Sequence, residues 1–183
     1  MVKPWRTLSS DEIISDQWIK LRADRCQRDD GKIIAPFYVR EAPDCVCILP
    51  LTDDRQVIVT TEYRHGVGRV VQGLPGGYVD SGDVSIGATA HRELLEETGY
   101  AARRMAPLGS FFMNWSNQTN RIHYFLAEGL YEAEGQRLDA TEDIQRELTP
   151  LADVRVPGFL EQTYHVTCLL LAENVLNIRG VNR

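Results

Sequence analysis

Residues 74–100, LPGGYVDSGDVSIGATAHRELLEETGY, constrain the fold more than any other part of this 183-residue chain. An apolar run ends at the adjacent glycines Gly76 and Gly77, and glycines at a strand end let another part of the backbone approach closely. The composition of residues 85–98 predicts a helix, with Gly99 as its left-handed terminator. The sequence therefore predicts a strand end that packs closely against a central helix.

Three glutamates, Glu93, Glu96 and Glu97, fall within about one turn of the predicted helix. Glu93 and Glu97 lie one above the other on the same face, with Glu96 beside them. Converging carboxylates suit a hard divalent cation such as Mg²⁺, and Gly76 can direct its carbonyl oxygen at the same cation. For an isolated cluster of this kind, a solvated acidic helix face is the alternative interpretation.

Residues 77–100 resemble the Nudix box, in which a glycine and a glutamate precede a helical arginine, three glutamates and a final glycine. The matching positions are Gly77, Arg92, Glu93, Leu94, Glu96, Glu97, Gly99 and Tyr100. Two features depart from the pattern. Asp83 stands where the pattern has glutamate, and eight residues rather than seven separate Asp83 from Arg92. Asp83 is interpreted either as the partner of Arg92 or as a helix cap.

The resemblance implies a Nudix-type pyrophosphohydrolase, which uses water to cleave a nucleoside diphosphate linked to another group. It implies that Mg²⁺ or Mn²⁺ is held by Glu93, Glu96, Glu97 and the carbonyl of Gly76. The acidic loop LDATEDIQREL resembles a loop that supplies a catalytic carboxylate in relatives. Glu142 in this loop is the first candidate for the general base, and Glu96 is the second.

The segment EYRHGVGRVVQGLPGGYVD resembles the ADP-ribose pyrophosphatase branch of the family. This resemblance assigns Arg64 to a phosphate or the ribose of the substrate, with Tyr63 as a second substrate-binding residue. A surface arginine paired with a local acid is the alternative interpretation. ADP-ribose is the favoured substrate, giving AMP and ribose 5-phosphate. The alternatives are another nucleotide sugar such as GDP-mannose, or a non-catalytic domain that senses a nucleotide. Because relatives in this branch are commonly homodimers, we expect a homodimer.

The rest of the sequence predicts strands on both sides of the central helix and a final helix from about residue 164 to 178. Asp-Asp-Gly at residues 29–31 separates two apolar runs and predicts a hairpin. The expected fold class is α+β: a Nudix-like α/β/α sandwich with a mixed central sheet and a small N-terminal antiparallel sheet. We expect residues 1–43 to form the N-terminal strands, a candidate dimerisation element, and residues 44–183 to form the Nudix hydrolase domain.

Aromatic and cysteine side chains supply further expectations about the core. Trp18, Phe37 and Tyr38 are interpreted as core residues of the N-terminal sheet, with stacking on a base or packing in a dimer as alternatives. The chain has four cysteines and no CxxC pair, so we interpret the cysteines as small buried hydrophobic residues. A metal-binding pair of Cys45 and Cys47 is the alternative.

The charge of the chain restricts its partners. The formal net charge is −6 and no lysine or arginine run stands out, so no nucleic-acid polymer is expected as a partner. No apolar run approaches membrane-spanning length, and the N-terminus lacks the apolar core of a secretory signal. We therefore expect a cytoplasmic protein that binds no membrane and acts on a small nucleoside diphosphate derivative.

Overall fold

A computed structural model describes residues 1–180, which form two compact units. One unit contains Met1–Pro43 together with Phe112–Arg121. The other contains Asp44–Phe111 and the described residues from Ile122 onward. The segment 112–121 joins the first unit through β3 (Ile33–Glu41), because the backbone N–H of Arg40 donates a hydrogen bond to the carbonyl of Asn117. The division of the chain into two domains at residue 43 stays a proposal.

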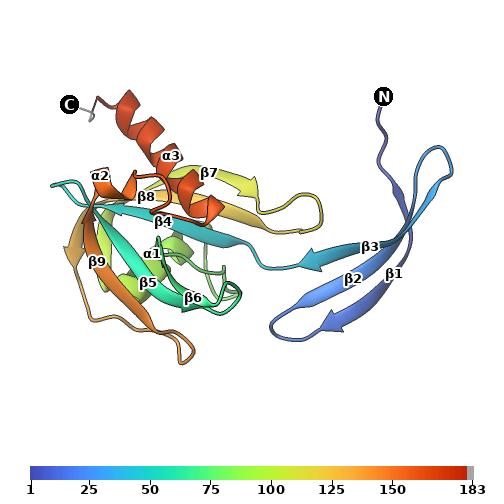
Figure 1. The fold of residues 1–183 in the computed structure, drawn as a ribbon, viewed down its shortest axis with the longest axis horizontal. Helices are drawn as coiled ribbons and strands as arrows, with labels where there is room; N and C mark the ends of the chain where they lie inside the picture. The colour runs from blue at the N-terminus through green and yellow to red at the C-terminus, as the bar shows by residue number, and fades with distance from the viewer. Residues whose placement is uncertain (181–183) are drawn as a thin grey trace. The chain divides into compact units, whose positions relative to one another are not determined.

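The first unit is a three-stranded antiparallel sheet in the order β1-β2-β3 (Figure 1). The hairpin between β2 (Lys20–Gln27) and β3 turns at the predicted Asp-Asp-Gly sequence, where Gly31 has φ +83°. β1 (Arg6–Ser15) was not predicted. Its residues are all exposed, so the sequence RTLSSDEIIS carries no alternation of buried and exposed positions that would indicate a strand.

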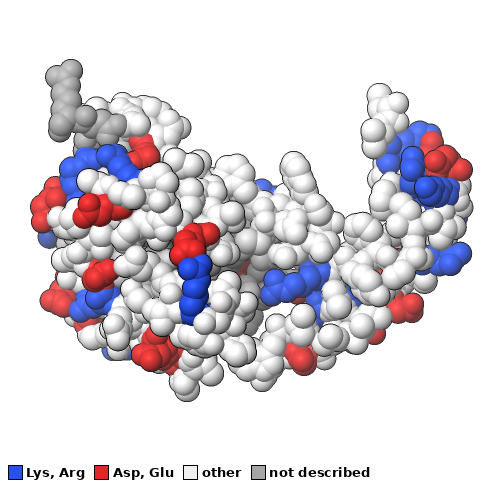
Figure 2. All heavy atoms as spheres, viewed as in Figure 1, with Lys and Arg blue, Asp and Glu red and all other residues white. Residues whose placement is uncertain are grey.

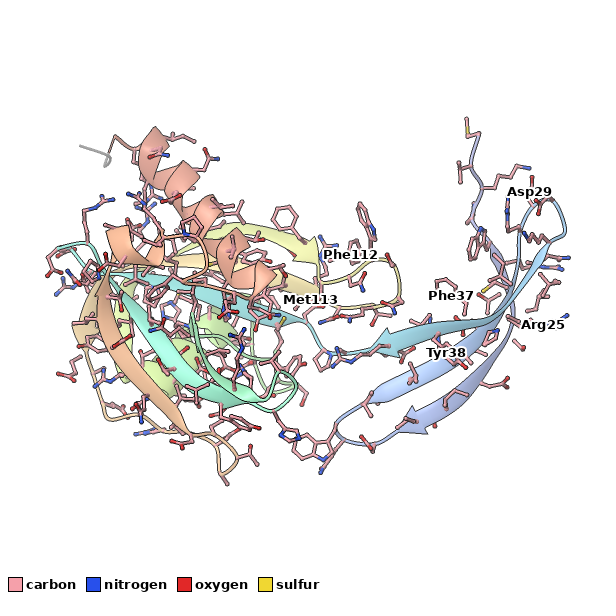
Figure 3. All side chains as sticks on the ribbon, viewed as in Figure 1. Arg25, Asp29, Phe37, Tyr38, Phe112 and Met113 are labelled. Atoms are coloured by element: carbon pink, nitrogen blue, oxygen red, sulfur yellow. The ribbon has the colours of Figure 1, made fainter. Side chains whose placement is uncertain are left out.

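The aromatic residues interpreted as core of this sheet are mostly exposed. Trp18 is 74 % exposed and Tyr38 is 51 % exposed, so the core interpretation was wrong for both. Phe37 is half-buried and packs edge-on against Trp5, with ring centroids 5.8 Å apart. Figure 3 shows Phe37 and Tyr38 on β3. Among the described hydrophobic residues of Met1–Pro43 only Cys26 and Val39 are buried, because the sheet has no second layer within its own unit.

The second unit is built on a six-stranded mixed sheet in the order β6-β5-β4-β8-β7, with β9 paired to β5 (Figure 1). Within this sheet β4 pairs with β8 in parallel, whereas β5 pairs antiparallel with β4, β6 and β9. The strands are β4 (Cys45–Leu51), β5 (Gln56–Arg64), β6 (Arg69–Gly73), β7 (Tyr100–Phe112), β8 (Arg121–Glu132) and β9 (Ile144–Pro150). The helices are α1 (Ile86–Thr98), α2 (Leu151–Val154) and α3 (Thr163–Ile178). The short helix α2 was not predicted.

Helices α1 and α3 cover opposite faces of β4, and every residue of β4 is buried as a result. On one face, Val46 and Ile48 pack against Leu94 of α1. On the other face, the Cys168 thiol of α3 donates a 3.6 Å hydrogen bond to the carbonyl of Cys47. Figure 1 shows α1 partly hidden behind the strands and α3 in front of them. This layering is the expected α/β/α arrangement.

The boundaries of the central helix agree with the sequence prediction. The Ser85 side chain accepts a 3.1 Å hydrogen bond from the backbone N–H of Ala88, as an N-cap does. At the other end Gly99 has φ +71°, and its N–H donates to the carbonyl of Leu95 at 2.7 Å. Local capping signals therefore fix where α1 begins and ends.

The distribution of surface charge and the lengths of the helices are relevant to nucleic-acid and membrane partners. On the face shown in Figure 2, basic and acidic side chains of the described residues are interspersed. No helix within residues 1–180 combines the length and the apolar character needed to cross a membrane.

Candidate functional site

The glycine turn at residues 73–77 is attached to the first half of β4. The N–H of Ile48 donates to the carbonyl of Pro75, and the N–H of Val46 donates to the carbonyl of Gly77, both at 2.9 Å. These two hydrogen bonds extend the sheet beyond β6 and hold the turn at a fixed place beside α1. The expectation of a strand end packed against the central helix is confirmed.

The two glycines are required by close approach on both sides. A Cβ at Gly76, which has φ +157°, would collide with the carbonyl oxygen of Val46. A Cβ at Gly77 would collide with the carboxylate of Glu93. Any larger side chain at either position would therefore push the turn away from β4 or from α1.

Glu93 and Glu97 on α1 are both buried, with 9 % and 6 % of their surface exposed. The backbone N–H of Gly76 donates a 2.9 Å hydrogen bond to Oε2 of Glu97. Burial raises the pKa of Glu97 to about 8, although the Gly76 hydrogen bond opposes the shift. Burial likewise raises the pKa of Glu93 to about 7, although the charge of Arg92 opposes it. Both carboxyls therefore lie in surroundings that disfavour their charge.

Arg92 connects the acidic groups around the helix. Its Nη1 donates to Oε1 of Glu93 and to Oε2 of Glu96, each at 2.9 Å. Its Nη2 donates to the carbonyl of Tyr78 at 3.1 Å and to Oδ2 of Asp83 at 3.0 Å. The guanidinium thereby joins the loop after the glycine turn to the glutamate face of α1.

The structure decides between the two interpretations of Asp83. Asp83 accepts two hydrogen bonds from Arg92, and the Arg92 interaction is the main reason that the pKa of Asp83 is lowered. The N-cap of α1 is Ser85, not Asp83. Asp83 also accepts from the Thr89 hydroxyl at 2.8 Å and from the N–H of Asp80 at 3.0 Å. Asp83 therefore reaches Arg92 although its side chain is shorter than that of glutamate. The extra residue between Asp83 and Arg92 in the sequence does not prevent this contact.

Glu142 lies in an exposed turn near the same acidic cluster. The N–H of Asp139 donates to Oε2 of Glu142, and the N–H of Glu142 donates to the carbonyl of Asp139, both at 2.9 Å. The charge of Glu142 contributes to the raised pKa values of Glu93 and Glu97. The charge of Glu62 on β5 also contributes to the raised pKa of Glu97. The turn therefore brings Glu142 within electrostatic reach of α1.

The loop that carries Glu142 is held to the end of α1 by hydrogen bonds. The side chain of Gln136 donates to the carbonyls of Glu97 and Ile144, at 2.5 and 3.1 Å. The backbone N–H of Arg137 donates to the carbonyl of Glu96 at 2.9 Å. These contacts explain why an acidic loop some 45 residues after the helix in sequence returns to it.

Sequence reasoning missed Glu62 as a member of the acidic cluster. Its pKa is raised by burial, and the charge of Glu142 adds to that effect. Side chains two residues apart in a strand point to the same face. This alternation could have placed Glu62 beside any site to which Arg64 was assigned.

Arg64 and Tyr63 lie at the end of β5 on the surface. Nη2 of Arg64 forms a 2.7 Å ion pair with Glu62, and 54 % of the Arg64 side chain is exposed. The hydroxyl of Tyr63 lies 3.3 Å from Nδ1 of His65. Pairing of Arg64 with a local acid is thus present, and the assignment of Arg64 and Tyr63 to the substrate stays a prediction.

The donor chemistry of the cluster fits a hard divalent cation. Glu93, Glu96 and Glu97 offer carboxylate oxygens, and two of the three are buried carboxyls with raised pKa values, which a cation would stabilise in the charged form. Within residues 1–180, no three acidic, histidine or cysteine side chains are already arranged around one point as metal ligands. Arg92 donates a hydrogen bond to one oxygen of Glu93 and to one oxygen of Glu96.

The four cysteines lie in the interior of their units. All four are buried, so the interpretation as buried hydrophobic residues is confirmed. Burial raises the pKa of Cys45 to about 11 and raises the pKa of Cys47 well above its usual value. Both thiols therefore stay protonated at neutral pH and pack as neutral groups.

Two known domains match this chain along most of its length. Residues 42–170 match the NUDIX domain, and residues 5–39 match the nucleoside diphosphate sugar hydrolase N-terminal domain. The ADP-ribose pyrophosphatase of Bacillus subtilis (strain 168) is 30 % identical over 141 residues, which cover 76 % of this chain and 75 % of that protein. The methanol dehydrogenase activator of Bacillus methanolicus is 29 % identical over 129 residues, covering 70 % and 69 % of the two chains.

A solved structure confirms the fold. The crystal structure of an ADP compounds hydrolase matches this chain with a TM-score of 0.87 over 98 % of each chain, at 22 % sequence identity. The mixed sheet with helices on both faces and the separate small antiparallel sheet, both expected from the sequence, are therefore confirmed.

The raised pKa of Glu97 predicts how stability depends on pH. The folded protein holds a proton on Glu97 up to about pH 8, whereas the unfolded chain releases it near 4.5. The stability linked to this group is therefore complete below pH 4.5 and is lost as the pH rises through 8. In a metal-free buffer, we expect Glu97→Gln to gain stability relative to the unaltered protein between about pH 5 and about pH 8.5.

Urea unfolding of both proteins at the two pH values measures this difference, because other titrating groups such as His165 are common to both and cancel. A stability difference that is the same at both pH values would show that Glu97 ionises normally in the folded protein.

Proposed function

This chain belongs to the NUDIX family of hydrolases, and we propose that it cleaves the diphosphate bond of ADP-ribose to give AMP and ribose 5-phosphate. The observation that carries the proposal is the pair of buried carboxyls, Glu93 and Glu97, packed against the glycine turn on the helix that holds the family motif. A relative named ADP-ribose pyrophosphatase, identical at 30 % of aligned positions, supports ADP-ribose as the substrate.

Hydrolases of this family generally use divalent metal ions, and we propose Mg²⁺ or Mn²⁺ for this chain. Glu93, Glu96, Glu97 and the carbonyl of Gly76 would hold the ion. Once bound, the ion would neutralise diphosphate charge and lower the pKa of a bound water. The raised pKa values of Glu93 and Glu97 support this assignment, since burial disfavours the charged form of both carboxyls and a bound cation would favour it.

The remaining residues have distinct proposed roles. Arg92 orients Glu93 and Glu96 through its two 2.9 Å hydrogen bonds and prevents them from turning into solvent. Glu142 takes the proton of the attacking water on its carboxylate, and the Asp139 N–H orients that carboxylate. Arg64 and Tyr63 hold the substrate at the exposed end of β5, where an arginine can pair with phosphate oxygens. Glu96 is the second candidate for the base.

Two other functions have support from particular observations. The match of residues 5–39 to a nucleoside diphosphate sugar hydrolase domain favours other nucleotide sugars, such as GDP-mannose, as the second candidate substrate class. The relative named methanol dehydrogenase activator favours a regulatory role as the third candidate, in which a nucleotide is sensed rather than turned over. The cytoplasmic location and the absence of nucleic-acid and membrane partners stay predictions.

Release of AMP from ADP-ribose tests the proposed reaction and the metal ligands together. We expect AMP in the presence of Mg²⁺ and at least about a hundredfold less with Glu97→Gln, because the variant keeps the shape of the side chain but removes a charged ligand. Glu132→Gln, which changes an exposed glutamate on β8, is the matched control and should retain full activity.

The same assay with GDP-mannose separates the substrate classes. Turnover of GDP-mannose without turnover of ADP-ribose would show that the substrate is another nucleotide sugar and not ADP-ribose. Hydrolysis of neither by folded protein, with both Mg²⁺ and Mn²⁺ supplied, would favour the regulatory role. Full activity in Glu97→Gln would refute the metal assignment.

The role of Glu142 is tested by Glu142→Gln. A positioned base contributes about 10²–10⁴-fold, so we expect kcat to fall by about a hundredfold or more while KM changes little. The neighbouring Asp143→Asn is the control, because Asp143 is an equally exposed acid of the same loop. A loss of less than about tenfold in Glu142→Gln would place the base elsewhere, with Glu96 tested next.

We also propose that the protein is a homodimer that uses the sheet of its first unit. That sheet exposes large apolar side chains and buries almost none of its own, and an isolated small sheet of this kind is marginally stable. The exposed apolar residues are Trp5, Leu8, Ile13, Ile14, Trp18 and Tyr38. A second copy of the chain would bury them.

Sedimentation at micromolar concentration tests the dimer. We expect twice the 20.7 kDa mass of one chain, and we expect Ile13→Asp to shift the protein toward monomer, since it places a charge among the apolar residues of β1. Lys3→Ser, an exposed change near the same strand, is the control. A monomeric mass for the unaltered protein would contradict the proposal.

A further inference from the structure

His165 in the first turn of α3 is a buried polar side chain that the proposed reaction does not use. Only 7 % of its surface is exposed, and its ring packs edge-on against Tyr164 with centroids 4.3 Å apart. Within residues 1–180, Nδ1 of His165 is buried and has no hydrogen-bond partner. A buried polar atom without a partner costs free energy, so its presence calls for a physical reason.

The His165 ring lies directly against Gly73, the last residue of β6. A Cβ built on Gly73 would lie 2.6 Å from Cε1 and 3.0 Å from Nδ1 of His165. The φ angle of Gly73 is not in the left-handed region, so its backbone conformation does not demand glycine. The imidazole is therefore the reason that position 73 has no side chain, and its Cε1 and Nδ1 atoms occupy the space that a side chain would need.

Gly73 begins the turn that forms one wall of the glutamate site. Gly76, three residues later, donates its N–H to Glu97, and the backbone of Gly77 packs against the carboxylate of Glu93. The turn is thus held from one side by His165 of α3 and from the other side by the glutamates of α1. The intervening Pro75 is fixed to β4 by its carbonyl. The backbone between Gly73, which contacts His165, and Gly76 is therefore held at both ends.

We infer that His165 is a positioning residue, whose ring sets the place of the glycine turn against Glu93 and Glu97. It acts on the site through the Gly73 backbone. Close packing at this point means that a change in the shape of residue 165 is transmitted to the Gly73 backbone. The catalytic part of this inference rests on the proposed function, whereas the geometric part does not.

The first experiment measures amide hydrogen exchange in protein without substrate or metal. We expect His165→Leu to exchange the Gly76 N–H at least about tenfold faster, since the hydrogen bond to Glu97 loses its fixed geometry. We expect the urea midpoint of this variant to be retained or raised, because leucine fills the volume and removes the unpartnered nitrogen. Leu176→Ala, at the far end of α3 and equally buried, should lower the midpoint without changing exchange at Gly76.

A double-mutant cycle tests the contact itself. Gly73→Ala should speed exchange at Gly76 in the unaltered protein, because the new methyl group meets the imidazole. In a His165→Ala background the methyl group has room, so Gly73→Ala should add less than about threefold. Equal effects of Gly73→Ala in both backgrounds would overturn the inference, as would unchanged Gly76 exchange in His165→Leu.

Steady-state hydrolysis supplies the catalytic readout. We expect kcat of His165→Leu to fall about tenfold with KM within about twofold, because misplacement of the turn affects the reacting end of the site rather than substrate capture. If the unaltered protein hydrolyses neither substrate while exchange at Gly76 responds as expected, the proposed function fails and the positioning role stands. If hydrolysis is normal in His165→Leu, the positioning role fails and the function stands.

Discussion

The hydrogen bond from the Gly76 N–H to the buried Glu97 carboxylate is the interaction on which the site depends. It can form only because residues 76 and 77 lack side chains, since a Cβ at either would collide with β4 or with Glu93. It is also insufficient, because burial still raises the pKa of Glu97 to about 8. The fold thus holds a carboxyl group in position without a counter-charge, so the group keeps its proton up to about pH 8, and a divalent cation would stabilise its charged form.

Arg92 limits how far this arrangement can relax. A single guanidinium holds Glu93 and Glu96 on one side and Asp83 on the other, so the acidic face of α1 cannot spread into solvent without breaking several charged hydrogen bonds. The same contacts show why the altered spacing in the motif is tolerated. Asp83 has a shorter side chain than glutamate and is one residue further away, yet the loop closes through Thr89 and Asp80 to bring it to Arg92. For the contact between Asp83 and Arg92, the number of residues between them matters less than the length of the arginine side chain.

Local signals in the sequence predict the part of the fold that local interactions determine. The helix α1 was predicted because its helix-forming composition and its glycine terminator both lie within the segment itself. The strand β1 was missed because none of its residues is buried. Trp18 and Tyr38 were misplaced in a core because hydrophobicity does not reveal whether the fold supplies a layer to cover them. Pairing of the segment 112–121 with β3 depends on contacts distant in sequence, which no local pattern contains.

Burial shifts the pKa values of several titratable groups within residues 1–180, and it brings those of Glu93 and Glu97 close to neutral pH. Burial raises the pKa of Cys45 to about 11 and, together with the charge of Arg64, lowers the pKa of His165 to about 3, so both groups are neutral at pH 7. Neutral groups can remain in a core without a counter-charge. Glu93 and Glu97, with pKa values of about 7 and about 8, exchange protons with solvent near neutral pH and are stabilised by any cation that reaches them. Burial therefore leaves Cys45 and His165 as neutral packing groups, whereas it leaves Glu93 and Glu97 able to ionise near neutral pH, as the proposed cation site requires.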